Sequence, residues 1–144
     1  GDGLQELFPV MATLEGLCAR MAVENCTPGQ LRELEAMHAL LEDAAAAGDV
    51  NRYFDENHVF HRAVQQLSGN RWLQRITGEL RGVLQLARQK QLTIPGRLMQ
   101  SLDEHRRIMR GFRDRDPLQA QQAMEAHLCR QQDALQEREP DPNQ

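Results

Sequence analysis

Apolar residues recur along the chain at the three- and four-residue spacing of amphipathic helices. No window alternates apolar and polar residues in the way that a half-buried strand does. The spacing predicts helices over residues 4–25, 28–47, 50–67, 71–91, 97–113 and 117–138. Only short turns separate these six segments, so the sequence predicts an antiparallel all-α bundle.

Residue types that begin helices mark several of these boundaries. Thr27 is followed by Pro28 and then Gln30, which is the pattern of a capping box. Asp49 and Asp116 stand where the third and sixth helices are expected to begin, and both are good N-cap residues. Pro9 interrupts the first helical segment, which suggests that the regular part of this helix starts there.

Polar side chains interrupt the apolar faces of three different helices. Asn57 and His61 lie one turn apart on the inward face of the third helix. His105 lies within the apolar seam of the fifth helix, and His127 within that of the sixth. Imidazole binds Zn, Ni, Cu and Fe well, and three such ligands leave coordination positions open.

On the first helix the apolar stripe consists of Leu7, Met11, Leu14, Cys18 and Met21.

A histidine on an apolar helix face has a simpler explanation, which is a hydrogen-bonded place in the core. His38 is expected to be of this kind. His58 is rotated off the inward stripe of its helix, so we expect it at the surface or just behind the site. For the three inward histidines together, a metal site and a hydrogen-bonded core stay equally open on the pattern alone.

The composition is that of one soluble globular domain, with 144 residues, 40% of them hydrophobic and 26% charged. The formal net charge of -4 argues against nucleic-acid binding, which needs clustered Lys and Arg. Three cysteines cannot all pair, which favours a reducing, cytoplasmic setting, and no apolar stretch is long enough to span a membrane. The chain opens on Gly1 rather than Met, so we expect part of the natural protein to precede it.

Motifs of enzymes are absent from the sequence. It contains no nucleophile elbow, zinc-protease helix, phosphate-binding loop or dinucleotide fingerprint. No Glu or Asp is evidently placed as a general base. A metal-dependent enzyme on a helical bundle therefore remains the alternative to a binding domain, and a buried carboxylate near the metal position would favour it.

Four segments, in the right order, resemble the motifs of FadR-like (FCD) domains, the effector-binding domains of one branch of the GntR-family transcriptional regulators. Asn57–Val64 (NHVFHRAV) with Ser68–Asn70 (SGN) resembles the D/N-x-x-F-H-R-A … S-G-N motif. Glu104–Ile108 (EHRRI) resembles E-H-x-x-I, and Ala123–Leu128 (AMEAHL) resembles A-M-x-x-H-L. Leu14–Glu15 and Ala19–Ala22 fit the first helix of the family.

The resemblance implies an antiparallel bundle of six to seven helices that holds a divalent metal through an Asp or Asn and three histidines. By motif, these ligands are Asn57, His61, His105 and His127. Zn²⁺ and Ni²⁺ are the leading candidates for the metal. Many members carry Asp where this chain has Asn57, and a neutral amide oxygen is a weaker ligand. If no metal binds, the same histidines and Asn57 could contact an effector directly.

The resemblance also implies partners. A small carboxylic acid is expected beside the metal, and its binding would control operator DNA binding by an N-terminal winged-helix domain that this chain does not contain. Arg81 and Arg88 on the predicted fourth helix are the candidates for binding the effector, although either one alone could simply face solvent. Residues 1–138 are expected to bind effector and to form a homodimer through the first or fourth helix, and residues 139–144 are expected to fray.

Overall fold

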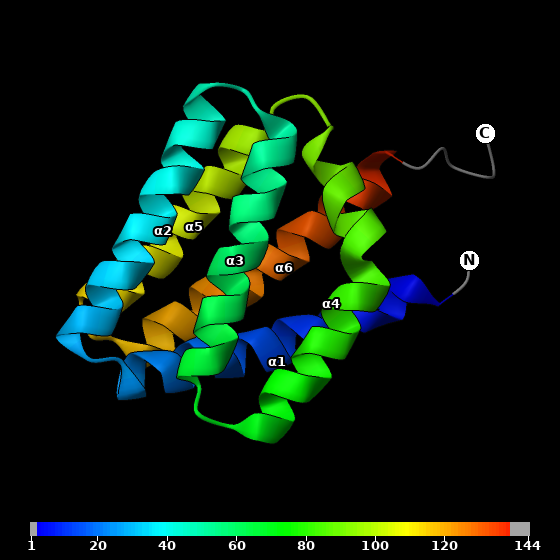
Figure 1. Cartoon of the computed structure of the whole chain (residues 1–144). Coiled ribbons are helices and arrows are strands. Elements are labelled where there is room, and N and C mark those ends of the chain that lie inside the picture. The colour runs from blue at the N-terminus through cyan, green and yellow to red at the C-terminus, as the bar shows by residue number, and fades with distance from the viewer. Residues whose placement is uncertain (1–2, 139–144) are drawn as a thin grey trace.

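The computed structural model describes residues 3–138, and these residues form six helices and no strand (Figure 1). The all-α prediction is therefore confirmed. The predicted frayed tail, residues 139–144, lies outside the described residues. The helices are α1 (Leu4–Asn25), α2 (Pro28–Ala46), α3 (Val50–Leu67), α4 (Arg71–Leu92), α5 (Arg97–Arg113) and α6 (Pro117–Arg138).

The predicted helix starts are confirmed by their hydrogen bonds. The backbone N–H of Gln30 donates to Thr27 Oγ1 at 3.1 Å, and the N–H of Thr27 donates to Gln30 Oε1 at 3.0 Å, which completes the capping box. The side chain of Asp49 accepts from the backbone of α3, and that of Asp116 accepts from the backbone of α6. Each cap satisfies an N–H group that the first turn of a helix leaves without a partner.

The expectation that the first helix becomes regular only at Pro9 is wrong, because α1 already begins at Leu4. Pro9 has no N–H to donate to the carbonyl oxygen of Gln5 one turn earlier. The side-chain amide of Gln132, on α6, donates to that oxygen instead, at 2.8 Å. A tertiary hydrogen bond thus replaces the missing helical one, and this replacement could not be read from the local sequence.

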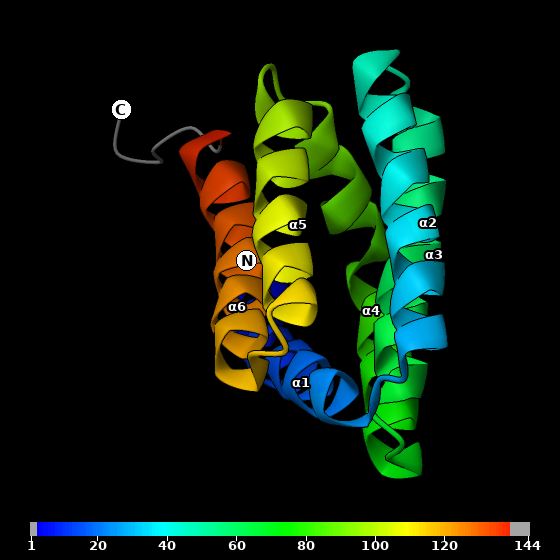
Figure 2. The same ribbon diagram turned by 90° about the vertical axis from the view of Figure 1, so that its left-hand side faces the viewer.

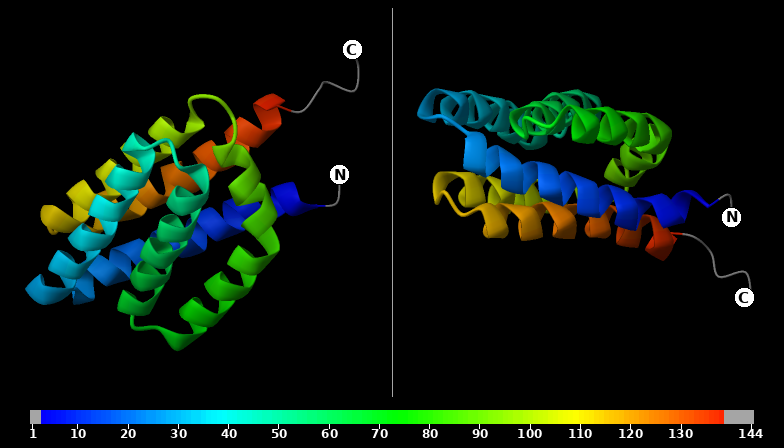
Figure 3. Two further views of the ribbon diagram at one scale, coloured as in Figure 1. Left: turned by 45° about the horizontal axis from the view of Figure 1, so that its top comes forward. Right: turned by 90° about the horizontal axis from the view of Figure 1, so that it is seen from below.

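The helices are arranged in two groups. α2, α3 and α4 lie on one side of the molecule, and α1, α5 and α6 lie on the other (Figures 2 and 3). The backbones of α5 and α6 come close at Gly111, where an added Cβ would lie 2.7 Å from the backbone nitrogen of Ala120. Glycine is therefore required at this contact.

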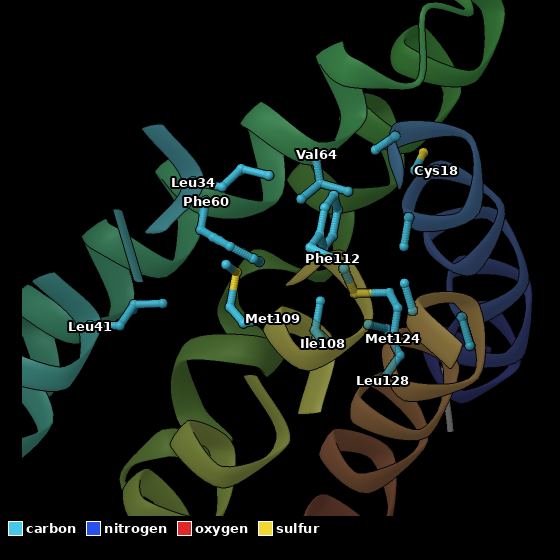
Figure 4. Close-up of a cluster of buried hydrophobic side chains, with 14 of the residues drawn as sticks. Cys18, Leu34, Leu41, Phe60, Val64, Ile108, Met109, Phe112, Met124 and Leu128 are labelled. Carbon is cyan, nitrogen blue, oxygen red and sulfur yellow. The ribbon is translucent and has the colours of Figure 1, made fainter. Parts of the chain in front are cut away.

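The hydrophobic core fills the space between the two groups. Figure 4 shows Phe60 and Val64 of α3 on one side, with Met109 and Phe112 of α5 and Met124 of α6 on the other. The inward polar residues of α3, α5 and α6 belong to the same faces, so they are held in the interior by this packing.

Among the described residues, no helix is long and apolar enough to cross a membrane.

Candidate metal centre and its charged neighbours

The three histidines predicted on separate helices meet in the interior. His61 of α3, His105 of α5 and His127 of α6 are each at most 1% exposed. They offer ring nitrogens that lie within 4.8 Å of one another. Two nitrogens bound to one ion at about 2.1 Å each are separated by at most about 4.2 Å. The cluster is therefore within a small side-chain rotation of the spacing that a metal requires.

Several polar atoms around this cluster have no hydrogen-bond partner. Both ring nitrogens of His61 and of His105 are buried without one, and so is the Oδ1 atom of Asn57. An unsatisfied buried polar group costs about 1–3 kcal/mol. Burial lowers the pKa of His61 to about 3 and the pKa of His105 well below its ordinary value, so both rings are neutral at pH 7. Neutral imidazoles keep the lone pair that a metal ion needs.

His127 is oriented by a carboxylate. Its Nδ1 atom donates to Glu104 Oε1 at 2.7 Å, which leaves Nε2 as the unprotonated nitrogen. Arg97 holds Glu104 through two hydrogen bonds of 2.7 and 2.8 Å. Burial alone would raise the pKa of Glu104, but the hydrogen bonds from Arg97 and His127 lower it to about 2. In this structure the amide nitrogen of Gln131 lies 3.2 Å from His127 Nε2.

A second buried group lies next to the histidines and is centred on Glu15 of α1. Its Oε1 atom accepts hydrogen bonds from Arg81 Nη1 at 3.0 Å and from Gln65 Nε2 at 3.2 Å. Arg88 Nη1 lies 3.6 Å from the same oxygen, and His61 Nδ1 lies 3.5 Å from it. One carboxylate oxygen thus connects two arginines of α4 to a histidine of the candidate metal site.

Arg81 and Arg88 are buried, with side-chain exposures of 6% and 3%, so the alternative that they face solvent is wrong for both. None of the three guanidinium nitrogens of Arg88 has a hydrogen-bond partner. Burial lowers the pKa of His127, and the positive charge of Arg88 contributes to the same shift. Arg88 is therefore a buried cation with free donors beside the histidine cluster.

Glu15 was missed as a site residue because the register of the first helix was predicted one position off. Of the predicted stripe, Met11 and Cys18 are buried, whereas Leu7, Leu14 and Met21 are only half-buried. The buried face is rotated toward Phe8, Ala12, Glu15, Ala19 and Ala22. A Glu in this otherwise apolar row was the available signal, because Glu is almost never fully buried unless it is paired.

Glu15 is also the kind of residue that the enzyme alternative requires, a buried carboxylate near the histidines. Burial alone would raise its pKa, but the charges of Arg88 and Arg81 are among the effects that outweigh burial and hold the pKa well below its ordinary value. A carboxylate with so low a pKa is a weak general base. The surroundings of Glu15 therefore favour charge balance over proton transfer.

The other two histidines behave as predicted. His38 is buried, and its Nε2 atom lies 2.9 Å from Glu42 Oε2, so it is a hydrogen-bonded residue at the edge of the core. His58 is half-buried, and its Nδ1 atom accepts from Arg81 Nη2 at 3.2 Å. His58 thus lies behind the site and contacts it only through Arg81.

The interior of the bundle thus holds three histidines, and a buried group of two arginines and one carboxylate adjoins them through His61. The sequence model of the FCD domain matches residues 6–130, and the chain belongs to this family. The resemblance seen in the four sequence motifs is therefore confirmed. No curated protein matches the chain by sequence.

Two solved structures of GntR-family regulators are similar to this chain. Streptococcus agalactiae GntR is 25% identical over 90% of this chain, with a TM-score of 0.76. E. coli McbR/YncC is 20% identical over 96% of it, with a TM-score of 0.86, a likeness that concerns the fold. The chain spans 58% of the first protein and 71% of the second. It is a ligand-sensing regulatory domain of this family and not an enzyme.

Proposed function

We propose that this chain is the carboxylate-sensing domain of a cytoplasmic GntR-family regulator, and that a divalent metal, Zn²⁺ or Ni²⁺, forms the centre of its site. His61, His105 and His127 would supply three nitrogen ligands, and Asn57 would supply a weaker oxygen ligand. The observation that carries the proposal is the set of buried, unpartnered ring nitrogens of His61 and His105 beside an oriented His127. One ion would bind one nitrogen of each of the three rings.

The charges of the site favour an anionic effector. When bound, the metal would supply an electrophile that keeps its full double charge, because all four of its protein ligands are neutral. Arg88 has free donors for a carboxylate, and Arg81 lies beside it on the same carboxylate oxygen of Glu15. A small carboxylic acid next to the metal would therefore find both positive charge and hydrogen-bond donors.

The position of the site is suited to signalling. Its residues come from α1, α3, α4, α5 and α6, and therefore from both groups of helices. An effector that binds one arrangement of these helices better than another shifts the population toward it. In the whole regulator, we propose that a separate winged-helix domain converts this shift into a change in operator binding.

We further propose that the domain forms a homodimer through α4. Trp72, Ile76, Val83 and Leu86 are exposed by 71%, 43%, 53% and 79%. Their spacing places them in one stripe, on the side of α4 opposite Arg81. A two-fold axis would pair this stripe with itself, burying apolar area that a single chain leaves in water.

Sedimentation equilibrium tests the dimer. At roughly 50 micromolar, a usual range for specific association, the parent should be dimeric and Leu86→Glu monomeric. Met99→Glu, at an exposed apolar position of α5, is the control and should leave the dimer intact. A monomeric parent, or equal dimerisation of both variants, would contradict the assignment to α4.

Metal analysis tests the centre itself. The purified chain would be stripped with chelator, reloaded separately with Zn²⁺ or Ni²⁺, and analysed for bound metal. We expect one ion per chain, loss of metal from His105→Ala and His127→Ala, and unchanged loading of His38→Ala. Asn57→Asp should retain metal through a chelator wash that strips the parent, because Asp is a charged oxygen ligand. Parental loading of both His105→Ala and His127→Ala would refute the metal site.

A further inference from the structure

A groove runs between α3 and α4 and ends at the charged group around Glu15. Its volume is about 500 Å³, and Gln65, Arg81 and Gly82 are among the residues that line it. Gln65 and Arg81 are also the two side chains that donate hydrogen bonds to Glu15. The groove therefore reaches the candidate effector site from the surface. Its volume lies within the range of small-molecule pockets.

Two glycines lie on the α4 wall of this groove, among longer side chains of the same helix. Gly78 and Gly82 both line the groove, and a Cβ added at either one would meet no heavy atom within 4 Å. Close packing therefore does not require them, in contrast to Gly111. Glycine is also a poor helix former. Their effect in this fold is to leave space beside Arg81.

The groove carries more positive than negative charge. Arg75 is paired with Glu79 at 3.4 Å, so these two residues balance. Arg62, also in the groove, forms no ion pair within the described part of the chain. Arg81 lies at the inner end, where its Nη1 atom contacts Glu15 and its Nη2 atom contacts His58. Arg81 thus reaches toward the groove and toward the histidine cluster at the same time.

A count of charges shows an excess that one carboxylate does not neutralise. Glu15 compensates only one of the two buried arginines of α4, Arg81 and Arg88. Arg62 adds a further positive charge in the groove, and a divalent ion on neutral ligands adds two more. An effector with a single carboxylate at the metal would leave Arg62 without an anionic partner in the groove.

We propose that the effector carries a second anionic group, and that this group binds in the α3–α4 groove against Arg62 and Arg81 while the first carboxylate lies at the metal. This inference rests on the proposed function and narrows its ligand class from carboxylic acids in general to short dicarboxylates. Arg81 is placed to contact both halves of such a ligand. Because Glu15 compensates only one of the two buried arginines, the ligand would supply the remaining negative charge.

Calorimetric titration of the metal-loaded chain with matched acids tests this proposal. Each monocarboxylate is compared with the dicarboxylate of the same carbon number: butyrate with succinate, pentanoate with glutarate, hexanoate with adipate. We expect at least one dicarboxylate to bind about tenfold more tightly than its partner, as one charge-assisted hydrogen bond would give. Arg62→Gln should abolish most of this preference. Arg130→Gln removes the same charge from an exposed position outside the groove and should leave the preference unchanged.

The outcomes separate this inference from the function on which it rests. Equal binding of monocarboxylates and dicarboxylates would overturn the second anionic group and leave the carboxylate sensor standing. If Arg62→Gln and Arg130→Gln show the same preference for the dicarboxylate, the second anionic group does not bind in the groove. If none of the acids binds to the metal-loaded chain, both proposals are wrong.

Discussion

Replacing Glu15 with Gln should remove the charge that balances two buried arginines. The Oε1 atom of Glu15 lies 3.0 Å from Arg81 Nη1 and 3.6 Å from Arg88 Nη1, and the three side chains are 1%, 6% and 3% exposed. Removing one partner of a buried pair costs about 3–5 kcal/mol, because the other charge stays in the interior uncompensated. Glu15→Gln preserves shape, so the loss should reflect charge.

We expect the metal-free Glu15→Gln chain to lose at least about 3 kcal/mol of unfolding free energy at pH 7. For a chain of this size, 1 kcal/mol corresponds to about 2–4 °C in Tm, so the midpoint should fall by at least roughly 6 °C. Urea denaturation gives the free energy, and a thermal scan gives the Tm. An added carboxylate should stabilise the variant more than the parent, because it can take the place of the lost counter-charge.

Glu24→Gln is the matched control. Glu24 pairs with Arg20 at 3.4 Å on the surface, where the two side chains are 49% and 51% exposed. Such a pair contributes less than about 1 kcal/mol, so this variant should unfold close to the parent. If Glu15→Gln and Glu24→Gln lose the same stability, the buried arginines do not depend on Glu15 and the charge count around the site is wrong.

The remaining predictions concern pH, packing and DNA. The folded pKa of His61 is about 3 and that of His105 is also lowered, so the unfolded chain binds more protons below pH 6.5. Each of these rings then lowers the free energy of unfolding by about 1.4 kcal/mol for each unit by which the pH falls below 6.5. Urea unfolding of the metal-free chain should show about 3 kcal/mol less stability at pH 5.5 than at pH 7.5, and a flat profile would refute neutral burial. Gly111→Ala should lose about 1–3 kcal/mol in thermal unfolding because its Cβ would meet Ala120. Gly78→Ala should gain up to about 1 kcal/mol of unfolding free energy. If Gly78→Ala were less stable than Gly111→Ala, the packing described for these two glycines would be wrong. In mobility-shift assays at physiological salt, the chain alone should form no sequence-specific complex with duplex DNA, given its net charge of -4.

The helices and the inward histidines could be predicted because their signals are local. A cap such as Thr27 acts on residues within one turn, and the capping hydrogen bonds were found where they were expected. His105 and His127 follow the helical period of their neighbours, so their burial could be read from spacing alone. The tertiary packing then places the helices that carry these histidines next to one another.

The charged part of the site could not be predicted because its partners are far apart in the sequence. Arg81 and Glu15 are separated by 66 residues, and nothing near either one indicates the other. A lone Arg on a helix is by default exposed, so the burial of Arg88 depends on the tertiary structure. The amphipathic pattern of the first helix allowed two registers one residue apart, and only packing against the other helices places Glu15 inside.

We propose that a metal and a carboxylate bind to one site and that each strengthens the binding of the other. The most direct test uses a carboxylate that is known to bind the metal-loaded chain. This acid is titrated into the metal-loaded form and, separately, into the chelator-stripped form. We predict at least about tenfold tighter binding to the loaded form, and, by linkage, an equal gain in metal affinity when the carboxylate is present. His127→Ala exposed to the same metal should behave like the stripped parent. Equal affinity for the loaded and stripped forms would contradict a metal-centred site, because the histidines and arginines would then bind the acid without a metal.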